Sequence, residues 1–234
     1  MKEARDRRTL LLVTRRLPPP LITADFWRRF CQLNLGLMVF GVAISLMLRA
    51  DIGLDPWSVL HQGLSDLTGL SFGRVTQLIG LLLIAYNFAA LQLRPGLGTA
   101  LNMLLVGPWI NFFEAQPWLP TAAAGAWGAG LAIFLLGTVL CGLAIGLYLT
   151  ARFGAGPRDD LVLGSALKLG RSVRLTRGGL EFAVLTGGFV LGGTVGLGTV
   201  LFAVLIGPVM QFFLWVFHYE RSPLAEVVAR AASD

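Results

Sequence analysis

Two Gly-Pro pairs stand at matching places in two apolar stretches, and their residue types could do chemistry. LGTALNMLLVGPWINFF begins at Leu97, and the near copy LGTVLFAVLIGPVMQFF begins 100 residues later, so the pairs are Gly107-Pro108 and Gly207-Pro208. A proline inside a helix removes one backbone hydrogen bond. The carbonyl that it frees can bind a solute or an ion where it is buried in a membrane. The same pairs also fit structural kinks that serve helix packing, and both interpretations stay open.

Polar side chains inside apolar stretches form a second group of candidates. Glu181 follows Arg177 by one helical turn, which predicts an ion pair within one helix. An acid inside a membrane is a functional candidate, although a shallow Glu181 could also reach the surface. Amide side chains either line a solute pathway or join neighbouring helices. These amides are Asn87, Asn102, Asn111, Gln77 and Gln211. The predicted solute-binding residues are Gly107, Pro108, Gly207, Pro208, Asn87, Asn102 and Glu181.

Catalytic and metal-binding patterns are missing from the sequence. No G-x-S-x-G, H-E-x-x-H or phosphate-binding loop pattern occurs. His61 and His218 lie in different segments, and Cys31 and Cys141 fall inside apolar stretches as small core residues. The sequence therefore predicts no enzyme activity, no catalytic residue, no metal and no cofactor.

Composition indicates the class of protein that must position these residues. Of the 234 residues, 55% are hydrophobic and 14% are charged, whereas soluble domains carry about 25% charged residues. Mean hydropathy is +0.71. Long apolar runs predict membrane-spanning helices. The predicted spans are Phe30–Leu48, Val75–Leu93, Leu97–Phe113, Trp127–Thr150, Gly178–Val195 and Leu197–Phe217. The sequence thus predicts an all-α integral membrane protein.

A short helix is predicted in each copy of the repeat, directly after a G-x-x-P turn. Pro56–Gly69 has Asp55 as its N-cap and proline at its first position. Pro157–Gly170 is its counterpart, with Asp159 and Asp160 in the first turn. Fourteen residues rise only about 21 Å, which is too short for a hydrocarbon core of roughly 30 Å. We therefore expect interfacial or partly re-entrant amphipathic helices.

The distribution of basic residues predicts three spans per copy. With the N-terminus inside, all but two of the 19 Lys and Arg residues, Arg49 and Arg74, lie on the cytoplasmic side. Two copies with three spans each must run in opposite directions, so the prediction is a 3+3 inverted-topology repeat. The predicted organisation is a basic cytoplasmic arm (1–29), a first repeat (30–113), an external linker (114–129), a second repeat (130–217) and a cytoplasmic tail (218–234).

Three further segments carry a family resemblance. GLDPWSVLHQGLS, TGLSFGRVTQLIG and RPGLGTALNMLLVGP resemble the YczE/YitT-like bacterial inner-membrane proteins over roughly residues 30–215. The second copy departs from this pattern, since GAGPRDD replaces GLDPWSV, and the two halves need not be functionally equal. The resemblance implies a multi-pass cell-membrane protein of unassigned activity, with no catalytic residue to carry over.

These patterns favour a secondary transporter or permease-like protein for an unidentified small solute. Its two halves would rock about a site at the bilayer midplane. The alternative is a non-transporting assembly or partner-binding protein, with the basic arm docking a protein or anionic lipid. The expected location is the bacterial inner (plasma) membrane, with both termini cytoplasmic. The net charge of +6 then reflects orientation rather than nucleic-acid binding, and a homo-oligomer is allowed.

Overall fold

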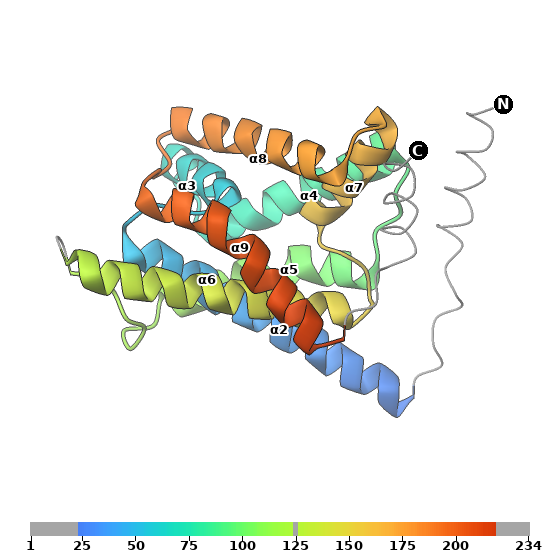
Figure 1. Cartoon of the computed structure of the whole chain (residues 1–234), viewed down its shortest axis with the longest axis horizontal. Helices are drawn as coiled ribbons and strands as arrows, with labels where there is room; N and C mark the ends of the chain where they lie inside the picture. The colour runs from blue at the N-terminus through green and yellow to red at the C-terminus, as the bar shows by residue number, and fades with distance from the viewer. Residues whose placement is uncertain (1–22, 124–125, 219–234) are drawn as a thin grey trace.

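The computed structural model describes residues 23–123 and 126–218, and Figure 1 shows their arrangement. Every regular element in this described part of the chain is an α-helix, which confirms the predicted all-α fold. Each half contributes a long helix, a short helix and two further helices in that order. Their bounds are α2 Ala24–Ala50, α3 Pro56–Thr68, α4 Phe72–Leu91, α5 Leu97–Glu114, α6 Trp127–Thr150, α7 Pro157–Leu169, α8 Val173–Val190 and α9 Leu197–Val216.

Four of these helices are long and apolar enough to cross a membrane. They are α2, α4, α6 and α9. The helices α5 and α8 are among the predicted spans but are shorter, with 18 residues each. The helix α8 also carries Arg174, Arg177 and Glu181. Four candidate spans are therefore established among the described residues, and six spans stay a prediction.

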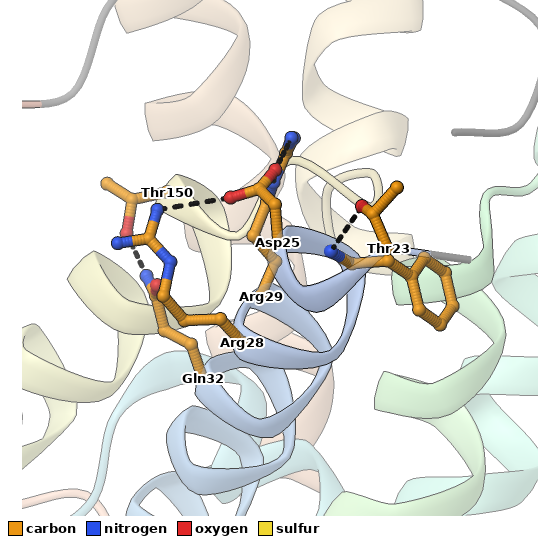
Figure 2. A network of polar contacts seen from close by, with 7 residues as sticks. Thr23, Asp25, Arg28, Arg29, Gln32 and Thr150 are labelled. Carbon is orange, nitrogen blue, oxygen red and sulfur yellow. Dashed lines mark hydrogen bonds and ion pairs between the residues drawn. The ribbon is translucent and has the colours of Figure 1, made fainter. Parts of the chain in front are cut away.

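Several helix ends differ from the predicted spans because polar caps extend the helices. The first helix begins at Ala24 rather than Phe30, since the Thr23 hydroxyl accepts a hydrogen bond from the Phe26 N–H. Figure 2 shows this end of α2, where Asp25 pairs with both Arg28 and Arg29. Residues 24–29 thus belong to the first helix, and the boundary of the arm in the membrane stays a prediction. Residues 1–22 of that arm and residues 219–234 of the tail lie outside the described residues.

The second predicted span of the second half is also displaced. Gly178–Val195 was expected, whereas α8 covers Val173–Val190. Its start is fixed by Ser172, whose hydroxyl accepts a hydrogen bond from the Leu175 N–H. Its end precedes Gly192, which adopts a positive φ of 95° that helices do not continue through.

The helices α2 and α6 form the centre of the fold, and glycines let them touch. A Cβ on Gly137 of α6 would lie 2.9 Å from the Ala43 carbonyl of α2. The last helix of each half packs on the long helix of the same half. The helix α5 lies against Gly41 of α2, and α9 lies against Gly142 of α6. Small residues at such crossings allow backbones to approach closely, which is how helices associate without a hydrophobic driving force.

Each of the two G-x-x-P turns packs on the other half of the chain. The first turn docks on the start of α9, where the Gly198 N–H donates to the Ile52 carbonyl at 2.7 Å. The second turn docks on the start of α5, where the Gly98 N–H donates to the Phe153 carbonyl at 2.8 Å. Each repeated turn therefore has its partner in the other half. This explains why the G-x-x-P and G-x-G-T motifs occur together twice.

The short helices α3 and α7 pack across the halves in the same way, α3 against α8 and α7 against α4. A Cβ on Gly188 of α8 would lie 2.4 Å from the Leu60 N of α3. The predicted N-cap Asp55 is confirmed. The first turn of α3 is buried in the bundle, and in the first turn of α7 Pro157 is buried and residues 158–160 are half-buried. Leu67 and Leu169 near their C-terminal ends are exposed. They are thus embedded at one end rather than laid flat on the protein surface.

Candidate functional site

A polar cavity is walled by side chains from all eight described helices. It encloses about 110 Å³, and α3 and α7 bring their first turns to it. Its apolar lining includes Phe40, Val106 and Phe202. Its polar, charged and aromatic lining residues of interest are Asp55, Trp57, His61, Thr76, Asn102, Tyr148, Arg158, Asp159, Arg177 and Glu181. A pocket with apolar walls and convergent polar groups is the usual form of a small-molecule site.

Arg158 and Trp57 make the contact at which α3 and α7 meet. The Arg158 guanidinium carbon lies 5.0 Å from the centre of the Trp57 ring, within the range of a cation–π interaction. These two residues occupy equivalent positions after the two G-x-x-P turns. The pseudo-symmetry of the sequence thus brings matching positions together, although one is aromatic and the other is basic.

Asp159, the residue after Arg158 in α7, begins a chain of polar contacts that reaches α6 and α8. The Tyr148 hydroxyl donates to Asp159 Oδ2 at 2.5 Å. Asp159 Oδ1 lies 3.7 Å from an Arg177 nitrogen, and Arg177 Nε donates to Glu181 Oε1 at 3.0 Å. The predicted Arg177–Glu181 pair is therefore present, and it belongs to a larger network. Both carboxylates of this network are partnered by Arg177.

Asp55 and His61 carry buried atoms without a partner. Asp55 is 4% exposed, and its Oδ2 accepts from the Trp57 and Ser58 N–H groups. His61 is 1% exposed, and its Nδ1 lies 3.0 Å from the Thr76 hydroxyl and 3.5 Å from an Arg158 nitrogen. Among the described residues, Asp55 Oδ1 and His61 Nε2 have no hydrogen-bond partner. An unpaired buried polar atom destabilises a fold by about 1–3 kcal/mol, more when charged, so these atoms point to an occupant.

The residues predicted from sequence as a solute site are only partly brought together. Asn102 and Glu181 line the cavity. Asn87 is buried beside it, and its Nδ2 donates to the Pro157 carbonyl at 2.9 Å. The four residues of the Gly-Pro pairs, Gly107, Pro108, Gly207 and Pro208, are not among the described residues that line the cavity. The two pairs also do not share surroundings, since Gly107 lies against α4 and Gly207 faces open space in the described structure.

The carbonyl freed by Pro108 has a protein partner. The helix α5 continues through this proline, which leaves the Leu104 carbonyl without its helical donor. Gln77 of α4 donates its Nε2 to this carbonyl at 2.9 Å. This geometry favours the packing interpretation of Pro108 over the solute-binding one.

Sequence reasoning did not select Asp55, His61, Tyr148, Arg158 or Asp159 for the site. Capping explained the two aspartates, and the two histidines of the chain were considered as a pair. A signal was present in the repeat, because the copies diverge at the positions that line the cavity. The diverging pairs are Asp55 and Gly156, Trp57 and Arg158, and His61 and Val162. Asp159 also lines the cavity, and its counterpart Ser58 does not.

A second hollow lies at the end of α2 that Figure 2 shows. It encloses about 550 Å³ and is open to the surface. In Figure 2, Gln32 contacts Thr150, with Nε2 donating to the hydroxyl at 2.7 Å, while Asp25 lies between Arg28 and Arg29. Ion pairs of this kind within one exposed helical turn contribute little to stability. The hollow reaches the limits of the described residues, and its charged groups are already paired, so the cavity at the centre of the bundle is the better candidate.

The acidic, histidine and cysteine side chains of the described residues are not arranged as a metal site. Across residues 23–123 and 126–218, no group of three or more His, Cys, Asp or Glu side chains is arranged to hold a metal ion. The free cysteines are also far from forming a pair, since Cys31 is exposed and Cys141 is buried against the cavity.

Comparisons with known proteins identify relatives but no activity. The model of a family of unknown function, DUF6198, matches residues 27–214. "Uncharacterized membrane protein YczE" of Bacillus subtilis is 35% identical over 178 residues, which cover 76% of this chain and 80% of that protein. An uncharacterized protein of Haemophilus influenzae is 38% identical over 178 residues, covering 76% and 79%. "Uncharacterized protein YyaS" of Bacillus subtilis is 26% identical over 190 residues, covering 80% and 92%.

None of the solved structures matches the chain. The name of the Bacillus relative and the apolar helices agree in indicating a membrane protein. The resemblance to YczE-like proteins that the G-x-x-P, G-x-G-T and Gly-Pro motifs predict is confirmed by these matches. The chain belongs to the DUF6198 family of YczE-like membrane proteins.

Proposed function

We propose that the chain is a secondary transporter for a small polar solute in the bacterial inner membrane, with the polar cavity as its binding site. The observation that carries this proposal is a small cavity lined by five charged side chains, buried or half-buried, that both halves contribute. Charged groups inside a membrane protein are costly unless they serve a pathway or a bound ligand. Packing alone does not require them at the centre of the bundle.

In this proposal six helices cross the membrane and form a 3+3 inverted-topology repeat. The helices α5 and α8 are the additional spans, and 18 residues rise about 27 Å, close to a hydrocarbon core of roughly 30 Å. The helices α3 and α7 enter from opposite faces and do not cross. Support comes from the paired contacts, in which each turn and each short helix packs on the other half. Both termini are then cytoplasmic, as the basic residues indicate.

The two halves suggest how the cavity would open. In the first half α4 is packed along α5, whereas in the described structure α8 and α9 diverge from their connection (Figure 1). Residues of both α8 and α9, such as Arg177 and Phe202, line the cavity. In this proposal the cavity opens between these two helices in this state. Rocking of the halves would close it and open the α4–α5 side, as in other inverted-repeat transporters.

The geometry supports transport better than the alternative of a non-transporting partner protein. A partner protein needs an external surface and has no need of a charged cavity. The segment proposed to bind such a partner, the arm of residues 1–29, lies mostly outside the described residues. No contact in the described part of the chain favours the partner hypothesis.

Transport can be tested with purified full-length protein in liposomes. The vesicles are incubated with a mixture of amines, amino acids, carboxylates and sugars, and the trapped solutes are measured by mass spectrometry. We expect at least one solute to enter faster than into empty vesicles, and Arg177→Gln to reduce its uptake. Asp66→Asn, which removes a charge at the outer end of α3, should leave uptake unchanged. If every solute were trapped equally in vesicles with the protein and in vesicles without it, transport would be contradicted.

A further inference from the structure

The charges that line the cavity do not balance. Asp55, Asp159 and Glu181 supply three carboxylates, and Arg158 and Arg177 supply two guanidinium groups. With a neutral His61, the wall therefore carries one negative charge in excess. Arg177 and Glu181 are partly exposed, whereas Asp55 is 4% exposed, so the negative charge that is least solvated is that of Asp55. A buried carboxylate is strongly unfavourable without a partner, which favours an occupant with one positive charge beside Asp55.

The unpartnered atoms of the cavity agree with this sign. Asp55 Oδ1 accepts hydrogen bonds only, and it has no donor among the described residues. The Thr76 hydroxyl donates to the Phe72 carbonyl, so its oxygen accepts from Nδ1–H of a neutral His61, and Nε2 is then a second free acceptor. Both unpartnered atoms therefore accept hydrogen bonds, which an ammonium group would donate.

Anion-binding groups in the same cavity are already engaged. Arg177 pairs with Asp159 and Glu181, and Arg158 lies over the Trp57 ring. The first N–H groups of α3 would be a natural anion site, but Asp55 Oδ2 accepts from two of them. An anionic solute would have to displace these contacts, whereas a cation would complete them.

We propose that this cavity binds a small organic cation through its ammonium group, with Asp55 Oδ1 as the main acceptor. The ammonium group donates to Asp55 Oδ1 and to His61 Nε2, and its short carbon chain lies against the apolar wall. Binding is independent of the proposed transport, and only the passage of this cation across the membrane rests on that proposal.

The size of the cavity limits the cation to a few heavy atoms. One water needs roughly 10–15 Å³ of such space, so about 110 Å³ holds roughly seven to eleven waters. A bare metal ion fits the wall poorly, since the described residues hold no cluster of three metal-ligating side chains. A short primary amine such as ethylammonium satisfies the size, the charge and the unpartnered acceptors together.

Equilibrium dialysis of purified full-length protein with radiolabelled ethylammonium tests this assignment. Acetate supplies the same size with negative charge, and glycine supplies both charges in one molecule. We expect saturable binding of ethylammonium to the wild type and weaker binding of the other two. Asp55→Asn keeps the helix cap, because asparagine caps as well as aspartate, but it removes the charge. It should lower affinity at least about tenfold, since hydrogen bonds to charged groups are worth about 1.5–3 kcal/mol.

The matched control is Asp66→Asn, which makes the same chemical change on the exposed end of α3 and should bind ethylammonium like the wild type. Preferential binding of acetate or glycine, no binding of ethylammonium, or unchanged affinity in Asp55→Asn would overturn the assignment. A flux assay in liposomes separates the two proposals. Ethylammonium that binds but does not cross contradicts transport alone, and flux of an anion that competes for the cavity contradicts the cation assignment alone.

Discussion

The two halves of the molecule carry the same Gly-Pro motif and use it differently. In the first half, a Cβ on Gly107 would lie 2.2 Å from the Gly73 carbonyl, so the backbones of α5 and α4 touch. In the second half, Val173 occupies the position equivalent to Gly73, and Gly207 faces open space in the described structure. A helix crossing this close requires small residues on both partners. The motif therefore permits the contact, and the residue opposite it decides whether the contact forms.

Side chains reinforce the same difference. Asn111 of α5 accepts from the Gly73 N–H and donates to the Ser71 hydroxyl, and Gln77 reaches the Leu104 carbonyl. The position of Gln77 in the second half is Arg177, which turns to Asp159 and Glu181 instead. In the first half these positions hold α4 and α5 together through hydrogen bonds. In the second half they place charged side chains in the wall of the cavity.

Bulky substitutions at the two equivalent glycines should have the largest effect. Gly107→Leu places a side chain where the Gly73 carbonyl lies, and we expect loss of more than about 3 kcal/mol of stability. Gly207→Leu meets open space and should change stability by less than about 0.5 kcal/mol. Thermal unfolding of both variants in detergent, followed by size-exclusion chromatography, measures the difference. Similar losses in both variants would show that the halves are packed alike.

Removing the basic side chain of the second half should have the next largest effect. Arg177→Met leaves Asp159 and Glu181 without their shared partner, and we expect a loss of about 1–3 kcal/mol because Arg177 is partly exposed. The double variant Arg177→Met with Glu181→Met should recover part of this loss. A stability for Arg177→Met equal to that of the wild type would mean that the charged chain does not support the fold.

The amide of the first half should contribute less. Gln77→Leu leaves the Leu104 carbonyl beside Pro108 without a donor, and about 1 kcal/mol of stability should be lost. The matched change Gln211→Leu removes an exposed amide of α9 and should be close to neutral. Denaturation midpoints of the two variants check this pair. Equal midpoints would indicate that the freed carbonyl has another partner.

Placing a glycine at position 173 of the second half should have the smallest effect of these changes. Val173→Gly should let α8 approach α9 and shield Cys141, which lines the cavity. In a Cys31→Ser background, we expect a small thiol reagent to label Cys141 severalfold more slowly than without the Val173→Gly change. Labelling faster than in the parent protein would place the exit elsewhere. Gly73→Val is not a suitable reverse test, because the Gly107 carbonyl leaves no room for a side chain there.

The short helices α3 and α7 show which features local sequence predicts and which depend on tertiary packing. The sequence predicts both of them and the N-cap Asp55 of the first, because a capping aspartate and a proline at the first position act on adjacent backbone groups. It does not predict how their first turns pack in the bundle, since that depends on α8 and α4 reaching them from the other half. The predicted interfacial or partly re-entrant position followed from local polarity and length, and the buried contacts of Gly188 with Leu60 lie far beyond any local pattern.

The candidate site shows the same limit. Asn102 and Glu181 were selected because a polar residue in an apolar stretch stands out. Asp55 and Asp159 were explained by capping, which is one of the two things that the Asp55 side chain does. Its other oxygen faces a cavity that exists only after residues about one hundred positions apart are brought together.

The sequence by itself therefore determined the helices, their caps, the membrane class and the family, because hydropathy, capping and repeated motifs are properties of short segments. The tertiary structure decided which helices touch and where charges gather, because a backbone contact such as that of Gly73 with Gly107 depends on both partners. The repeat stated that two equivalent halves exist. Only their packing decided that α4 and α5 of the first half are in close contact and that the second half provides a wall of a charged cavity.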